Sequence, residues 1–146
     1  MTNMEIQAFF SNPSPIEKNV LDSLQNEKTF NLPAEYIAFL KATDGGMLKN
    51  GKATFYSISN RLVSGERFYE MNQGQNPKLL LIGHYTTQTS EEDFGYLKGE
   101  LASGKTAIFV QLEESDEVVK IAGSLEELLS NLSGMNVIDA SKEQGV

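Results

Sequence analysis

Apolar residues recur at helical spacing in three stretches of the chain, which predicts three helices. They cover residues 14–26, 32–43 and 124–132. The first and the third begin with a serine followed three residues later by glutamate, the pattern of a capping box, and the first also has a proline at its first helical position. Residues 1–12 are expected to form a short helix or a loose arm on the body of the protein.

After the second predicted helix, the apolar period changes from helical to strand-like. Five runs rich in aromatic and β-branched residues predict strands, and a short helix is expected at residues 64–72. The last three strands are expected to form an antiparallel meander. Because helices and strands are segregated along the chain, the pattern predicts an α+β fold. The strands are predicted at residues 53–59, 79–85, 94–97, 106–112 and 117–122.

A length of 146 residues fits a single domain, because folding at this size buries roughly 70% of the extended chain's surface. No internal repeat or low-complexity tract interrupts it. We expect one domain over residues 1–146, with its core at about 14–132 and a weakly ordered tail at 133–146.

The composition excludes several kinds of chemistry. The chain has no cysteine, so thiolate catalysis is excluded, and any catalytic triad or histidine metal site would have to use the single histidine, His84. We interpret His84 as a core or rim imidazole, since it lies within an apolar strand run. No nucleophile elbow and no cluster with metal-ligand spacing is present. We therefore predict no enzyme, no metal and no cofactor.

The ends and apolar runs of the chain bear on its location. The N-terminal residues lack the basic and apolar regions of a secretory signal. No apolar run approaches the roughly 20 residues that cross a bilayer. We expect a cytoplasmic protein that does not enter a membrane.

The formal net charge of −8 is concentrated in the second half of the chain. Residues 1–80 carry eight acidic and eight basic side chains, whereas residues 81–146 carry twelve acidic and four basic ones. Such a field opposes binding to nucleic acid or to an anionic membrane. It favours a basic protein partner, and solubility is the simpler alternative explanation.

One segment follows an unusual pattern: Leu-Pro, two residues, Tyr, two residues, Phe-Leu, and then Asp-Gly-Gly. The proline suits a first helical turn, and the glycines can adopt the left-handed conformation that ends a helix. The pattern resembles the signature of the SUKH superfamily, which includes the fungal cell-wall-assembly regulator and many bacterial immunity proteins. It is carried by Leu32, Pro33, Tyr36, Phe39, Leu40, Asp44, Gly45 and Gly46.

The resemblance extends over about residues 14–132. Ile82 and Gly83 match a strand pair typical of the family, and a meander and a closing helix follow in the family's order. Many members have asparagine where this chain has Asp44, and a Gly- and Asp-rich turn where it has residues 84–90. The resemblance implies helices packed on a twisted, mainly antiparallel sheet, with mainly structural roles for the motif residues. For bacterial members it implies immunity, the neutralisation of a toxin domain.

A second pattern, Gly-x-x-x-x-Gly-Lys-Thr at residues 99–106, matches the phosphate-binding loop of nucleotide-binding proteins letter for letter. That chemistry needs a helix directly after the loop, whose N–H groups hold the phosphates. Residues 107–112 have strand composition instead, and Glu100 would repel phosphate. We interpret the segment as a hairpin loop.

Two acidic clusters are candidates for partner contacts, and both are interpreted as surface loops. Neither has the alternating ligands and glycine of a calcium-binding loop. Like charges held close together cost stability, and a cationic partner would relieve that cost; ordinary solvation is the alternative. The clusters comprise Glu91, Glu92, Asp93, Glu113, Glu114, Asp116 and Glu117.

The sequence thus predicts a non-enzymatic protein-binding domain of undetermined oligomeric state. The leading hypothesis is an immunity protein that occludes a basic toxin domain, such as a nuclease. The alternative is a cytoplasmic adaptor of the cell-wall-assembly-regulator type. An immunity protein should bind one partner tightly, whereas an adaptor should bind several partners weakly.

Overall fold

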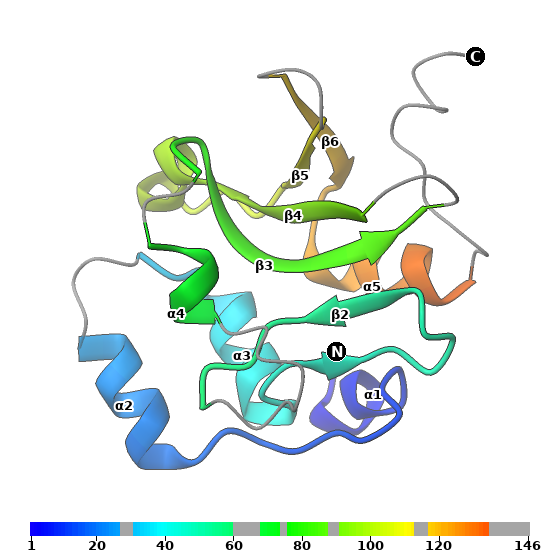
Figure 1. Cartoon of the computed structure of the whole chain (residues 1–146). Helices are drawn as coiled ribbons and strands as arrows, with labels where there is room; N and C mark the ends of the chain where they lie inside the picture. Colours follow the sequence, from blue (N-terminus) through cyan, green and yellow to red (C-terminus); the bar gives the residue numbers. More distant parts are fainter. Residues whose placement is uncertain (27–30, 60–67, 74–75, 88–90, 113–116, 135–146) are drawn as a thin grey trace.

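The strands form one antiparallel sheet in a computed structural model of the chain, which describes residues 1–26, 31–59, 68–73, 76–87, 91–112 and 117–134 (Figure 1). Within this described part, neighbouring strands follow chain order from β1 to β6. The predicted meander of three strands is therefore half of a longer one. The strands are β1 Gly46–Met47, β2 Ala53–Phe55, β3 Leu79–Thr86, β4 Glu91–Leu97, β5 Ile108–Gln111 and β6 Val118–Ala122.

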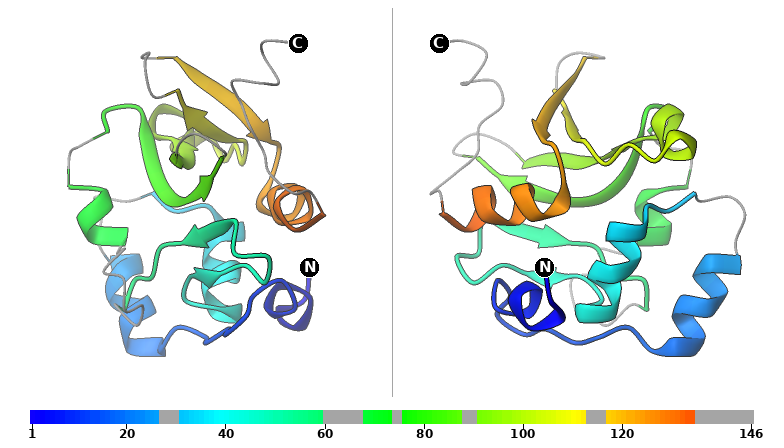
Figure 2. Two further views of the ribbon diagram at one scale, coloured as in Figure 1. Left: turned by 45° about the vertical axis from the view of Figure 1, so that its right-hand side comes forward. Right: turned by 180° about the vertical axis from the view of Figure 1, so that it is seen from behind.

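Helices precede the first strand and follow the last strand along the chain. Seen from behind, α1, α3 and α5 all lie in front of the strands, so the first and last helices cover the same face (Figure 2). This arrangement confirms the predicted α+β fold class with a mainly antiparallel sheet. The helices are α1 Asn3–Gln7, α2 Lys18–Asn26, α3 Ala34–Ala42, α4 Phe68–Met71 and α5 Leu125–Gly134, with a 3-10 helix, η1, at Lys98–Ser103.

The core lies between α3 and the strands and is rich in aromatic side chains. The Phe39 ring lies 5.1 Å from the Phe55 ring, which lies 5.2 Å from the Phe94 ring. Tyr36 and Leu40 on the same helix are fully buried. On α5, four leucines at helical spacing are buried, as the apolar pattern predicts: Leu125, Leu128, Leu129 and Leu132.

The predicted start of the first long helix is wrong. Helix α2 begins at Lys18 and ends at Asn26, so Ser14 caps nothing. Residues 14–16 instead run beside the end of α3, where the Ile16 N–H donates to the Leu40 carbonyl at 3.1 Å. The Asp44 N–H donates to the Ser14 carbonyl at 2.7 Å. This long-range pairing holds the Ser-Pro segment extended.

The boundaries of α3 and α5 also differ in detail. Pro33 is the N-cap of α3 rather than part of its first turn, and α3 ends at Ala42 with Thr43 extended. Ser124 caps α5 by accepting the Glu127 N–H at 3.2 Å. The Glu127 carboxylate accepts the Gly123 N–H at 3.0 Å, so the return bond of the capping box reaches one residue further back than expected.

Several predictions fall partly or wholly outside the described residues. Of the helix expected at 64–72, the structure describes α4 at Phe68–Met71. Residues 56–59 are described, but they do not belong to β2, which ends at Phe55 rather than at the predicted residue 59. The expected turn at 113–116 and residues 135–146 of the expected tail lie outside the described part of the chain.

Candidate functional site

Asp44 is a buried carboxylate that holds the segment after β2. It is 1% exposed, and its oxygens accept the N–H groups of Ile58 at 2.7 Å and Ser59 at 3.1 Å. The hydroxyls of Ser57, at 3.2 Å, and of Ser59 also donate to it. The sequence pattern indicated only a turn here. A carboxylate with this many donors is a structural anchor for the residues it binds.

The two glycines after Asp44 and the later Ile-Gly pair bring backbones into close contact. Gly45 has φ +68°, and a Cβ there would lie 2.6 Å from the carbonyl oxygens of Phe55 and Tyr56. Gly46 has φ 131° and opens β1. A Cβ on Gly83 would lie 2.6 Å from the tip of the Phe94 ring. The glycines therefore do not end α3 themselves; they bring the chain against β2 and the core.

The first acidic cluster is not a loop. Glu91, Glu92 and Asp93 are the first residues of β4, paired with residues 84–86 of β3. Glu92 is buried, and Asp93 accepts the Tyr56 hydroxyl at 2.8 Å. The ladder extends through this charged run because pairing with the apolar β3 outweighs its low strand propensity. Only Glu91 of the three is exposed.

The second acidic cluster is described only at its end. Glu117 is exposed and lies directly before β6. Glu113, Glu114 and Asp116 lie outside the described residues. The Leu112 N–H donates to the Glu117 carbonyl at 3.1 Å, and the antiparallel register places Glu117 at the same end of the sheet as the start of β4, where Glu91 lies.

His84 belongs to a polar group on the strands that the sequence did not indicate. The strand register places it between Thr54 of β2 and Asp93 of β4, on the face of the sheet opposite Phe55 and Phe94. His84 is 8% exposed, and its ring lies 5.9 Å from the Tyr56 ring. Asp93, nine residues away in sequence, is thus the acidic neighbour that sequence spacing could not reveal. The small exposure agrees with the interpretation of a core or rim imidazole.

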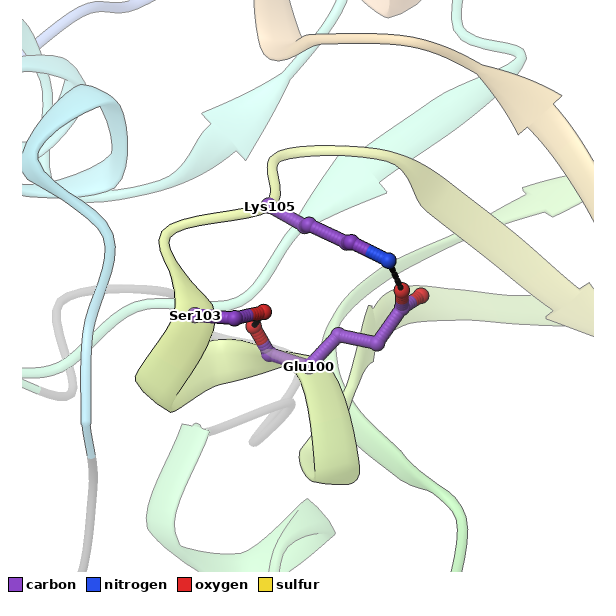
Figure 3. A network of polar contacts seen from close by, with 3 residues as sticks. All are labelled: Glu100, Ser103 and Lys105. Atoms are coloured by element: carbon purple, nitrogen blue, oxygen red, sulfur yellow. Dashed lines mark hydrogen bonds and ion pairs between the residues drawn. The ribbon is translucent and has the colours of Figure 1, made fainter.

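Polar side chains of the phosphate-loop pattern bind other residues of the protein (Figure 3). Lys105 forms an ion pair with Glu100 at 3.0 Å, and the Ser103 hydroxyl donates to the Glu100 carbonyl at 2.8 Å. Thr106 donates to the Gly123 carbonyl at 2.9 Å. Strand β5 follows at Ile108, where a phosphate loop requires a helix. The segment is a connection between strands, built around η1 and a left-handed Gly104.

A groove of about 180 Å³ lies between α1, α3 and the start of α5. Its lining is mainly apolar, with Glu35 of α3 and Glu126 of α5 as the two acidic members. The Glu35 carboxylate accepts the Leu125 N–H at 2.8 Å and so joins α3 to α5. No sequence signal indicated this site, because its walls come from three distant segments. The lining consists of Met1, Ile6, Glu35, Ala38, Phe39, Ser124, Leu125, Glu126 and Leu129.

Burial shapes the electrostatics of Glu35. It raises the pKa of the Glu35 carboxyl, although the hydrogen bond from Leu125 opposes this shift. The hydroxyl of Tyr96 is buried and has no hydrogen-bond partner among the residues that the structure describes. Burial, and then the charge of Glu35, raise the pKa of Tyr96. The Glu35 charge therefore sits in a poorly solvated place.

We expect Glu35→Gln to become more stable relative to wild type as pH rises from 4 to 7. A carboxyl whose folded pKa lies above its unfolded pKa disfavours folding once it ionises, so wild type loses stability across this interval. Glutamine stays neutral and can still accept the Leu125 N–H. Urea unfolding at several pH values would measure the difference. A smaller change is expected for the exposed control Glu126→Gln, and an unchanged Glu35→Gln difference would contradict the prediction.

The fold and these contacts define a helix-covered antiparallel α+β domain whose Leu-Pro…Asp-Gly-Gly segment is built into the core. The described residues contain no group of three or more His, Cys, Asp or Glu side chains that could hold a metal ion. The chain belongs to the SMI1 / KNR4 family (SUKH-1), whose family model matches residues 15–131. This confirms the resemblance to the SUKH superfamily.

Two further comparisons and one structural finding complete this picture. Neither the comparison with curated proteins nor that with solved structures gives a significant match. Within the described ranges, every helix is too short or too polar to cross a bilayer.

Proposed function

We propose that this chain is a non-enzymatic protein-binding domain that neutralises a basic toxin domain, such as a nuclease, by covering its active surface. Membership of the SMI1 / KNR4 family carries the proposal, because the superfamily includes immunity proteins and regulators. Two residues that could have indicated nucleotide binding or catalysis make structural contacts instead. Lys105 is paired with Glu100, and His84 is nearly buried.

The charge distribution supports a basic partner. The net charge of −8 arises entirely in residues 81–146, and Glu91, Glu117, Glu126 and Glu127 of that half are exposed. A surface of one sign accelerates encounters with the opposite sign by roughly 10- to 1,000-fold. A toxin that binds nucleic acid needs positive surface, and this chain would compete for it.

An adaptor of the regulator type is the second candidate, favoured by the family's inclusion of regulators. A tagged pull-down from native cytoplasm at low and high salt separates the two. One stoichiometric basic partner is expected for immunity, whereas several substoichiometric partners would indicate an adaptor. Recovery of no partner would contradict the immunity proposal.

With the captured partner, we expect the double variant Glu91→Lys/Glu117→Lys to associate about tenfold more slowly at low salt, with a weaker salt dependence. Both side chains are exposed, so the fold should tolerate the change. Two substitutions at Glu17 and Asp22, which are exposed in the balanced half, give the same change in net charge as a matched control. Stopped-flow association measures the rates. An equal rate for wild type and double variant would remove these residues from the encounter surface.

A further inference from the structure

The groove between α1, α3 and α5 has the chemistry of a binding site for a long cationic side chain. Its volume is about 180 Å³, and its floor includes Phe39 and Leu129, both buried apolar residues. Glu35 lies at one wall and Glu126 at another. Apolar walls with carboxylates at their margin match a lysine or arginine, whose stem is apolar and whose head is charged.

The charge around the groove is unbalanced. The three helices that form it carry four glutamates and one lysine; the lysine is not among the lining residues, whereas Met1, which carries the N-terminal ammonium, is. Glu35 is already partly withdrawn from water, which raises its pKa. Its carboxylate accepts the Leu125 N–H, and the hydroxyls of Thr106 and Tyr96 lie close enough to oppose this rise in pKa. A carboxylate has about four acceptor positions, so a charged donor would compete with these hydroxyls for the positions that Leu125 leaves.

The rim of the groove supplies an apolar contact surface. Met1 lines it and is 45% exposed, whereas Met4 is 79% exposed but lies two positions from the lining residue Ile6 on α1 and does not share its face. Together with Met47, they are the exposed large hydrophobic residues of the described chain. Flexible methionine side chains adapt readily to a partner surface.

We propose that the α1–α3–α5 groove receives an arginine or lysine of the protein partner, with an apolar neighbour of that residue packed on Met1. This inference rests on the proposed function, since it names the place where a basic partner docks. The Glu35 carboxylate binds the cationic head, and Glu126 lies at the entrance. Ala38 is an exposed residue of α3 that lines the groove, so a longer side chain at this position would fill it.

The test uses the full chain, ¹⁵N-labelled, titrated with the peptide acetyl-Leu-Arg-Leu-amide and observed by NMR. Saturable shifts of the amides at 35–39 and 124–129 are expected, with a Kd on the order of 1 mM for so small a ligand. The same peptide with neutral citrulline in place of arginine should bind at least about tenfold more weakly. Absence of saturable shifts, or equal binding of the citrulline peptide, would overturn the proposal.

Two variants localise the site. Glu35→Gln should weaken the peptide about tenfold by removing the charge while leaving an acceptor for Leu125. Ala38→Leu should abolish the shifts by filling the groove, and Ala34→Leu, at an exposed position of α3 outside the lining, is the matched control. Undiminished binding by both Glu35→Gln and Ala38→Leu would refute the assignment.

The captured partner separates this inference from the proposed function. If the partner binds wild type tightly and Ala38→Leu equally well, the groove assignment fails and the proposed function stands. If the peptide binds in the groove but no basic partner is captured, the groove is a cation site and the proposed function fails. Tight binding by wild type and a loss of about tenfold or more in Ala38→Leu, but not in Ala34→Leu, supports both.

Discussion

Asp44→Ala is expected to lower the free energy of unfolding by about 3 kcal/mol or more. The substitution removes the acceptor of at least two backbone N–H groups, those of Ile58 and Ser59, and of two serine hydroxyls. Leaving one buried donor unsatisfied costs about 1–3 kcal/mol. Thermal denaturation should show a fall in Tm of roughly 6–12 °C for a protein of this size.

The loss should begin where the carboxylate binds. The Ser57 carbonyl accepts the Phe68 N–H at 3.0 Å, and the Phe68 ring stacks on Tyr36 at 6.1 Å. Release of residues 57–59 would therefore loosen α4 and its contact with α3. Hydrogen exchange should show early loss of protection at the amides of Ile58, Ser59 and Phe68.

Two further variants test this account of Asp44. Asp44→Asn keeps one carbonyl oxygen as an acceptor and should cost less than the alanine variant. Asp22→Ala removes an exposed carboxylate on α2 and should stay within about 0.5 kcal/mol of wild type. If Asp44→Ala were as stable as Asp22→Ala, the carboxylate would not anchor the segment.

Local patterns predicted the fold well where burial follows one element's own period. The helical spacing of Tyr36, Phe39 and Leu40 identified the buried face of α3, and the apolar run at 79–85 identified β3. Both signals come from residues close together in the sequence, because the apolar period of an element indicates which of its faces packs on the core.

The errors arose where pairing with a distant segment decides the conformation. Ser14 has the local signs of a helix cap, yet its backbone pairs with Asp44, thirty residues later. Glu91–Asp93 has the composition of a loop, yet it continues the ladder with β3. Local propensity cannot contain this information, since the competing partner lies elsewhere in the chain.

The candidate site shows the same division. The family motif could be recognised from the sequence because its residues are contiguous. The structural role of Asp44 could not, since its hydrogen-bond donors lie thirteen to fifteen residues away. The groove joins residues of α1, α3 and α5, and the bond from Leu125 to Glu35 spans ninety positions. Only the assembled fold places these residues together.

Gly95→Ala is the second substitution for which we expect a large loss, about 3 kcal/mol or more. A Cβ at this position would lie 1.9 Å from the Leu80 carbonyl oxygen and 2.9 Å from the Leu81 Cα, both on the neighbouring strand β3. These are backbone atoms of a central ladder, so no side chain can rotate away. Overpacking a close-packed interior costs about 1–3 kcal/mol and more where the backbone must move.

The reason for this close approach is an irregularity between Leu81 and Gly83, where the β3–β4 register shifts and Ile82 has no partner on β4. The shift brings β3 against Gly95 and presents Gly83 to the Phe94 ring. The Ile-Gly pair of the family pattern, on β3, and Gly95, on β4, thus lie on the two strands of the same bulge. Bulges bend a strand locally and increase its twist.

Gly99→Ala provides the matched control, since a Cβ there would meet no atom within 4 Å. It should leave stability within about 0.5 kcal/mol of wild type, whereas urea unfolding of Gly95→Ala should show a large shift of the midpoint. Gly83→Ala should also destabilise, but less, because one of its close contacts is the end of a side chain. If Gly95→Ala unfolded like Gly99→Ala, β3 and β4 could not approach as closely as the bulge requires, and the structural reading of the Ile82-Gly83 pair would be wrong.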